Sequence, residues 1–366
     1  MQTGSRTCRL SRSFASLALA AFVPLLLSPP ARAARPVRPA VTTSGIHFVD
    51  RAGRIVILRG VDVSYQSRLV EKVIELHANF ARVRVLWADI EPRRGRLDAG
   101  ELERLDAFIL YLTSHRVNVV LDLRGKELPG WVNRRGFHVR HAPAPRGAYL
   151  VFVRALVRRY AGNPRVIGFG IFNEPRPYVW DHVGSPEVDR EMLEWQAGIR
   201  DAILAIDPYT TVFFNVRGGA LGARACFRCA GFRLAHTALD WHDFYNGCCG
   251  SGLDAAADNW IPNWSETHNQ LSTRYLGTAR NQWLNLAIPW RSTHLNGIPM
   301  IVGEWGARND DVRNHVYNEQ VEGIMRRHGI SWARWNLDCV SKFGLVSHGR
   351  LNEQGQWLAS EILGTG

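Results

Sequence analysis

Two glutamates stand where runs of apolar residues end. Glu174 follows the run Val166–Phe172 and Asn173, and Pro175 behind it lacks the backbone donor that further strand pairing needs. Glu304 closes a second apolar run, in the stretch IVGEWG. Two carboxylates on one cleft are what hydrolysis of a glycosidic bond requires: one protonates the leaving oxygen, the other attacks the sugar or activates water. Taken singly, each glutamate also fits a structural interpretation, as part of a capped helix start or as the partner of an arginine.

The elements that must position these glutamates are β-rich runs alternating with amphipathic stretches. The expected strands are Gly60–Ser64, Phe80–Leu86, Val117–Leu123, Val166–Phe172, Thr211–Val216, Ala238–Phe244, Pro299–Gly303 and Ser331–Trp335. The expected helices are Leu97–His115, Tyr149–Tyr160, Glu187–Ile206, Leu271–Asn296 and Val312–His328. This alternation indicates a parallel sheet, and eight strands close a (β/α)8 barrel.

An open, doubly wound sheet is the competing architecture. It would carry a G-x-G-x-x-G turn between an early strand and a helix. Gly168-Phe169-Gly170 falls inside an expected strand instead, so we expect a single TIM barrel. Catalytic groups of such barrels lie at the C-terminal ends of the strands. The fourth and seventh expected strands end at Glu174 and Glu304 and lie across the mouth from one another, which brings both carboxylates to a common cleft.

The first 33 residues have the pattern of a secretory signal peptide. Arg6, Arg9 and Arg12 precede the apolar run Ala15–Leu27, and a small-residue cleavage site ends near Ala33. The apolar run is too short to span a bilayer, which takes about 20 residues. We therefore expect a secreted protein, extracellular or periplasmic, with no stable membrane insertion.

The remaining chain divides into a flexible lead-in at 34–44 and the catalytic barrel at 45–366. The barrel is expected to open with a β-hairpin formed by Ile46–Val49 and Ile55–Leu58 around a glycine-containing turn. The formal charge of +12 is spread along the chain and forms no nucleic-acid-binding arm, so we expect no nucleic-acid partner and a monomer.

Long loops should follow the third, fifth and sixth strands and build the rim. The last of them holds Trp260 and Trp264, which either stack on distant sugars or pin the loop to the barrel. His138 and His141 have a spacing that metal sites sometimes use, but no acidic or cysteine partner stands near them, so we expect no metal and no cofactor.

Five cysteines follow the signal peptide. They are Cys226, Cys229, Cys248, Cys249 and Cys339. Export favours disulfide bonds, although the first four could also form a small structural zinc site. The adjacent pair Cys248-Cys249 is awkward for tetrahedral ligation, which favours disulfides.

Together these features resemble family 5 of the glycoside hydrolases, the cellulase-like retaining barrels, across nearly all of residues 45–366. The residues that carry the resemblance are Leu58-Arg59-Gly60-Val61, Arg84 in FARVRVLW, Asn173-Glu174-Pro175, His242 and Tyr245 in DWHDFYNG, Glu304 in IVGEWG, Trp335 in SWARWNLD and Phe343-Gly344-Leu345. None of these motifs is specific alone, but their order and spacing are.

The resemblance implies a role for each site residue. Glu174 would be the general acid/base and Glu304 the nucleophile, about 5 to 5.5 Å apart as in retaining enzymes. Arg84 would hold Glu304 ionised and oriented, because an adjacent guanidinium favours the charged carboxylate. Asn173 would hydrogen-bond the sugar 2-hydroxyl.

Three further residues would line the cleft. His242 and Tyr245 would form its floor, and Trp335 would offer a flat wall to the sugar at the cleavage point. Arg124 stands where the third strand of the family usually ends in a histidine. Tyr245 comes one residue later than in the usual His-x-Tyr, and a shift of one residue reverses the face of a strand. Tyr245 can therefore line the cleft only if the strand has already ended before this residue.

Three functions fit these patterns. The first is retaining hydrolysis of a β-linked glycan, of the endoglucanase or cellulase type. The second keeps the chemistry and changes the substrate to mannan, a glycolipid or another glycoconjugate. The third is a sugar-binding protein on a barrel that has lost catalysis, but a binding protein needs neither an acid nor a nucleophile.

Overall fold

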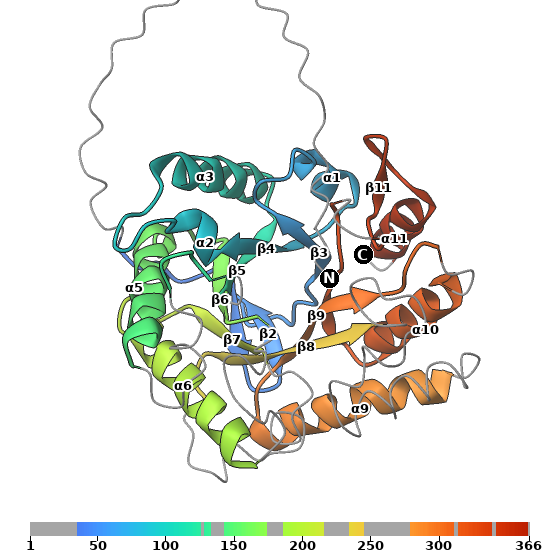
Figure 1. Ribbon diagram of the computed structural model, residues 1–366. Helices are drawn as coiled ribbons and strands as arrows, with labels where there is room; N and C mark the ends of the chain where they lie inside the picture. The colour runs from blue at the N-terminus through green and yellow to red at the C-terminus, as the bar shows by residue number, and fades with distance from the viewer. Residues whose placement is uncertain are drawn as a thin grey trace, which may run out of the picture. The chain divides into compact units, whose positions relative to one another are not determined.

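The computed structural model describes residues 35–125, 128–132, 143–173, 186–215, 234–244, 279–310, 314–338 and 342–364. Eight parallel strands form a closed barrel in the order β10-β3-β4-β5-β6-β7-β8-β9 (Figure 1). Their bounds are β3 Arg59–Ser64, β4 Phe80–Leu86, β5 Asn118–Arg124, β6 Val166–Ile171, β7 Thr211–Asn215, β8 Thr237–Phe244, β9 Met300–Gly306 and β10 Ser331–Arg334. The expected TIM barrel is confirmed, with each strand close to its predicted bounds.

Helices surround this barrel. They are α1 Val70–Glu75, α2 Trp87–Ile90, α3 Ala99–Ser114, α5 Pro143–Tyr160, α6 Pro186–Leu204, α9 Ala279–Asn296, α10 Asn314–Arg327 and α11 Glu353–Leu363. Helix α3 begins at Asp98, whose side chain accepts a hydrogen bond from the Glu101 amide and so caps the helix. The sequence did not predict α1 and α2, because they are too short to show a helical period.

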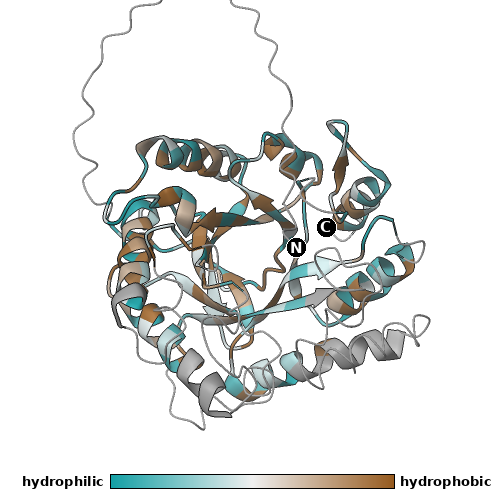
Figure 2. Ribbon diagram, in the orientation of Figure 1, coloured by the Kyte–Doolittle hydropathy of each residue, from teal (hydrophilic) through white to brown (hydrophobic). Residues whose placement is uncertain are grey.

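Figure 2 shows hydrophobic residues along the barrel strands and on parts of the surrounding helices. In α3, the residues Leu105, Phe108, Ile109 and Leu112 are buried, and their spacing places them on one side of the helix. Within the described residues, no helix is both long and apolar enough to cross a membrane. After the barrel, a small antiparallel pair of strands, β11 Val346–Ser347 and β12 Arg350–Leu351, precedes α11.

The N-terminal hairpin lies one strand earlier than the sequence suggested. Strand β1, Val41–Ser44, pairs antiparallel with β2, His47–Asp50. The turn between them contains Gly45, whose φ of 55° suits glycine. Residues 41–44, predicted to be flexible, therefore form a strand, while the expected partner segment contributes an isolated bridge between Val49 and Ile55.

The hairpin closes the floor of the barrel interior. An apolar cluster fills this floor with one residue from each barrel strand or its border: Leu58, Phe80, Val120, Ile167, Phe213, Ala238, Ile301 and Ala333. Val41 and Phe48 of the hairpin belong to the same cluster, and the ring of Phe48 stacks on Phe213 at 5.9 Å between centroids. The hairpin thus covers the end of the barrel opposite the expected active site.

Candidate active site

Above this apolar floor, the barrel interior holds a buried layer of charged side chains, which we call the charged layer. Its members are Asp62, Arg82, Arg84, Asp122, Arg124, Asp240, His242 and Glu304. Each strand alternates its faces, so positions two residues apart point the same way. The inward set therefore runs from the floor residue Phe80 to Arg82 and Arg84, and from Val120 to Asp122 and Arg124.

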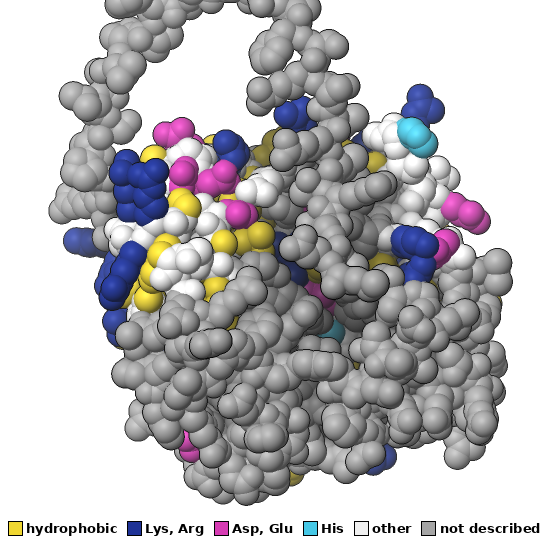
Figure 3. All heavy atoms as spheres, viewed as in Figure 1, with side chains coloured by type: hydrophobic (Ala, Val, Ile, Leu, Met, Phe, Trp, Pro, Cys, Tyr) yellow, Lys and Arg dark blue, Asp and Glu magenta, His cyan; other side chains and the backbone are white. Residues whose placement is uncertain are grey.

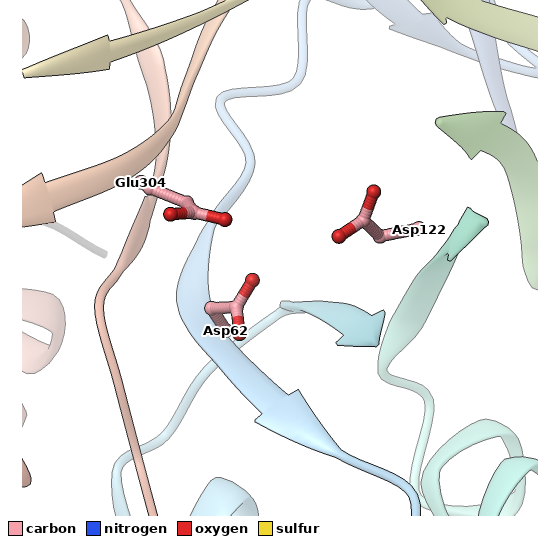
Figure 4. A group of neighbouring side chains, drawn as sticks. All are labelled: Asp62, Asp122 and Glu304. Carbon is pink, nitrogen blue, oxygen red and sulfur yellow. The ribbon is translucent and has the colours of Figure 1, made fainter. Parts of the chain in front are cut away.

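Arg82 lies at the centre of the charged layer. Its Nη1 is 2.7 Å from Asp62 Oδ2, 3.0 Å from Asp122 Oδ2 and 2.8 Å from Glu304 Oε1. Figure 4 shows these three carboxylates turned toward a common space. Each offers an oxygen within 4.8 Å of the others, a set that a divalent cation would fit. The Arg82 guanidinium takes that position itself, so the arrangement is an ion-pair cluster centred on arginine.

The other terminal nitrogen of Arg82 faces the end of β6. Arg82 Nη2 donates to Asn173 Oδ1 at 2.6 Å and lies 3.0 Å from Asp240 Oδ2. Asn173 is fully buried, and its Nδ2 has no hydrogen-bond partner among the described residues. Because Arg82 fixes the amide oxygen, the amide nitrogen is left oriented as a donor, as the predicted contact with a sugar hydroxyl requires.

Glu304 is 2% exposed, and its two oxygens have different surroundings. Oε1 accepts hydrogen bonds from Arg82 at 2.8 Å and from Arg124. Oε2 lies 3.6 Å from His242 Nδ1. Charge-assisted hydrogen bonds of this kind are stronger than neutral ones and favour the ionised carboxylate. The site therefore holds Glu304 as an oriented anion, the state that a nucleophile needs.

A β-bulge in β9 brings Glu304 to this position. The register with β8 shifts between the pairs Trp241–Val302 and His242–Glu304, which leaves Gly303 as the extra residue. A Cβ on Gly303 would lie 2.0 Å from Asp240 Oδ1, so only glycine allows this close approach.

The contact expected for Arg84 is corrected by the structure. Arg84 Nε lies 2.7 Å from Asp62 Oδ1, and Arg84 Nη2 donates to Asp338, whereas Arg82 and Arg124 bind Glu304. Both arginines of β4 face inward, and Arg82 is the one nearer the floor. The spacing R-x-R in β4 and D-x-R in β5 could have indicated a shared inward face, but not the depth of each side chain.

His242 lies in β8 beside the charged layer, and its predicted place in the floor of a sugar-binding cleft stays a prediction. Its Nε2 is 3.0 Å from Asn215 Nδ2, at the end of β7, and 3.7 Å from Asp240 Oδ1. The Nδ1 side of the ring therefore faces Glu304, and the Nε2 side faces Asn215 and Asp240.

Trp335 follows β10 and is 7% exposed. The guanidinium carbon of Arg84 lies 4.9 Å from its ring centroid, and that of Arg124 lies 5.2 Å away. These are cation–π distances. Trp335 is thus packed directly against the charged layer, and its role as a wall for the sugar stays a prediction.

The remaining predicted site residues lie outside the described residues. They include Glu174, which directly follows Asn173, and Tyr245, which directly follows β8. The same holds for Trp260, Trp264, His138, His141, the signal peptide and all the cysteines. Their predicted roles remain predictions.

Burial and charge act in opposite directions on the acids of the charged layer. Burial raises the pKa of Asp62 to about 6, against the lowering effect of Arg84, Arg124 and Arg82. For Asp240, burial acts to raise the pKa, but Arg82 and His242 outweigh it and the net pKa falls.

The arginines of this layer stay charged. Burial alone would lower their pKa, but the surrounding carboxylates raise the pKa of Arg82 and of Arg124 well above the usual range. Beside them, burial raises the pKa of Asp338. The layer therefore combines permanent cations with carboxyl groups of unequal acidity.

The site lies on one face of the barrel, where acidic, basic and histidine side chains are visible near the centre (Figure 3). Catalytic groups of (β/α)8 barrels lie at the C-terminal ends of the strands, where Glu304 stands, and glycoside hydrolysis uses two such carboxyl groups. The Cellulase (glycosyl hydrolase family 5) model matches residues 49–340. The chain belongs to this family.

One curated relative is Endoglycoceramidase I of Rhodococcus hoagii (strain 103S). It is 25% identical over 231 residues, covering 49% of this chain and 47% of the relative. The match thus spans about half the length of that protein.

Among solved structures, endo-glycoceramidase II from Rhodococcus sp., in a cellobiose-like isofagomine complex, has a TM-score of 0.63 at 18% identity, covering 86% of this chain and 81% of that chain. The catalytic domain of the major endoglucanase from Xanthomonas campestris pv. campestris has a TM-score of 0.62 at 16% identity, covering 88% and 99%. An endogalactoceramidase has a TM-score of 0.62 at 17% identity, covering 88% and 84%. At these identities the likeness shows the shared barrel fold.

Proposed function

We propose that this protein hydrolyses a β-linked glycoside by double displacement, with Glu304 as nucleophile and Glu174 as acid/base. One observation carries the proposal: Glu304 is buried, with two guanidinium groups on Oε1 and His242 beside Oε2. Asn173 supports it, since its amide is fixed by Arg82 immediately before Glu174 in the chain.

In the first step, the Glu304 carboxylate attacks the anomeric carbon while Glu174 protonates the departing glycosidic oxygen. The product is a glycosyl ester on Glu304. In the second step, Glu174 takes a proton from water, the water attacks the same carbon, and Glu304 leaves as a carboxylate. Two inversions give net retention. Arg82 keeps Glu304 ionised and oriented before the first step, and it stabilises the carboxylate that leaves in the second step.

The test is covalent trapping with an activated 2-deoxy-2-fluoro β-glycoside, followed by mass spectrometry of the peptides. A single label on Glu304 supports the proposal, and a label on another residue refutes it. Glu322→Gln is a matched control, because Glu322 is equally buried but lies in α10, outside the barrel interior. This control should be labelled like the wild type.

For the substrate, we propose a glycolipid whose sugar is β-linked. The curated relative and several structural neighbours are endoglycoceramidases, and one of these neighbours is in complex with ganglioside GM3. The endoglucanase neighbour supports β-glucan as the second candidate. Mannan remains the third substrate to test.

A direct comparison separates these substrates. The purified protein is assayed on lactosylceramide in detergent micelles, on soluble β-glucan and on mannan, with NMR analysis of the anomer first released. Faster turnover of lactosylceramide supports the glycolipid proposal, and turnover of β-glucan alone overturns it.

We also propose that the chain is exported and cleaved near Ala33, on the basis of the signal pattern at its N-terminus. Mass spectrometry of protein from the culture medium and from periplasmic extracts should find an N-terminus close to Ala34. Intact protein that starts at Met1 and stays inside the cell would contradict this.

A further inference from the structure

Arg124 crosses the barrel interior. It is the last residue of β5, and four steps around the barrel order separate β5 from β9 in either direction. These two strands are therefore diametrically opposite. The Arg124 side chain nevertheless reaches Glu304 Oε1 on β9 and is 4% exposed.

Four neighbours surround the Arg124 guanidinium. Its Nε donates to Asp122 Oδ2 at 2.6 Å, on the same face of β5. Its Nη2 donates to Glu304 and lies 3.6 Å from Asp62 Oδ2. Its guanidinium carbon lies 5.2 Å from the centroid of the Trp335 ring. One planar group thus lies among three carboxylates and an aromatic ring, a geometry that suits arginine and not lysine.

We propose that Arg124 is a positioning residue for the nucleophile, which holds Glu304 Oε1 from the opposite side of the barrel and sets the direction of the carboxylate. This rests on the proposed role of Glu304. Arg82 and Arg124 bind the same oxygen from two different strands, so the carboxylate cannot rotate without breaking both bonds. The same two donors stabilise the negative charge when Glu304 departs from the glycosyl ester.

The contact with Trp335 extends the role of Arg124 to the substrate wall. If a sugar stacks on Trp335, the guanidinium packed on this ring also sets the distance between the sugar and the nucleophile. Arg124 would therefore couple the binding of the sugar to the orientation of the attacking group, an effect on kcat more than on KM.

Arg84 supplies a matched control. Its guanidinium is also buried and lies 4.9 Å from the same Trp335 ring, but its ion pairs are with Asp62 and Asp338. Loss of Arg84 removes a cation from the same layer without removing a hydrogen bond to Glu304. A non-specific effect of removing a buried cation would appear in both variants, whereas mispositioning of the nucleophile should appear only when Arg124 is lost.

The experiment compares Arg124→Gln, Arg124→Lys and Arg84→Gln in the full chain. Thermal unfolding first establishes that each variant is folded. The pH profile of kcat/KM is then measured on an aryl β-lactoside, together with the rate at which the fluorinated glycoside labels Glu304.

Arg124→Gln removes a cation from beside Glu304 and so raises the pKa of this carboxyl. The acidic limb of kcat/KM should move to higher pH by about 1 unit. Its kcat and labelling rate should fall by about 10²-fold or more. Arg124→Lys keeps the charge, so its acidic limb stays near that of the wild type, while kcat falls because an ammonium group cannot replace the planar fork. Arg84→Gln should shift the limb less than Arg124→Gln.

Labelling of Glu304 at the wild-type rate in Arg124→Gln, with an unshifted acidic limb, would overturn the inference. So would equal limb shifts in Arg124→Gln and Arg84→Gln. If Arg124→Gln does not fold, Arg124→Lys decides, since wild-type kcat in that variant would also overturn it. Failure of the proposed function gives a different result, namely a label on a residue other than Glu304 in the wild type.

Discussion

The floor and the charged layer lie on the same inward face of the same strands, yet they have opposite chemistry. In β4, Arg82 comes two positions after the apolar Phe80, and in β8 Asp240 comes two positions after Ala238. The floor removes apolar surface from water, which stabilises the fold. The charged layer removes charges from water, which costs free energy unless each charge is paired.

The two regions have different tasks: the floor stabilises the barrel, and the charged layer holds the candidate site. TIM-barrel interiors are usually filled by bulky branched side chains. Here only the end covered by the hairpin follows that rule, and the end that carries Glu304 does not. Substitutions in the floor should therefore lower the stability of the protein and leave the activity of each folded molecule intact. Substitutions in the charged layer should lower activity, with or without a loss of stability.

The largest effect is expected for Glu304→Gln. The substitution is nearly isosteric but cannot form the glycosyl ester, so kcat should fall by about 10⁴-fold or more. Steady-state assays against the wild type and the Glu322→Gln control measure this effect. Activity within tenfold of the wild type would show that the charged layer does not contain the nucleophile.

The next largest effect is expected for Arg82→Met, which should lower stability and activity together. It leaves several buried carboxylates without their central cation, and such a loss destabilises by about 3–5 kcal/mol. Urea unfolding measures the stability, and the kcat of the folded fraction measures the activity. A variant as stable as the wild type would mean that Arg82 does not hold this layer together.

Phe48→Ala tests the floor. It removes the ring that stacks on Phe213 and should destabilise by about 3–4 kcal/mol, within the range known for buried phenylalanines. Activity per folded molecule should be unchanged, because the hairpin covers the opposite end of the barrel. A fall in kcat at full folding would contradict the division between the two regions.

The smallest effect is a pH dependence that arises from Asp62. Its pKa is raised from 3.8 to about 6 in the folded protein. Between these values the folded state holds a proton that the unfolded state has released, so this contribution to stability is present below about pH 4 and is lost as the pH rises through 6. Urea unfolding of the wild type and Asp62→Asn at pH 4.5 and 7 tests this. The free energy of unfolding should fall less between pH 4.5 and pH 7 in Asp62→Asn than in the wild type. An equal fall in both proteins would show that Asp62 does not cause this pH dependence.

The sequence predicted most of the barrel because the signals for it are local. A strand such as Phe80–Leu86 is a short β-rich run, and a helix such as Ala99–Ser114 shows an apolar period and an N-cap. The hairpin was predicted one strand too late because two neighbouring turns, at Gly45 and Gly53, both carry glycine. Local patterns do not decide which of two turns joins the paired strands.

The sequence by itself determined the alternation of strands and helices, the glutamate in β9 and the family. It also placed Asn173, His242 and Trp335 at strand ends, where the barrel brings them to one mouth. Only the tertiary structure decided that Arg82 and Arg124, and not Arg84, bind Glu304. The physical reason is that alternation along a strand fixes which face a side chain takes, while its depth in the barrel depends on strand stagger and on the bulge at Gly303.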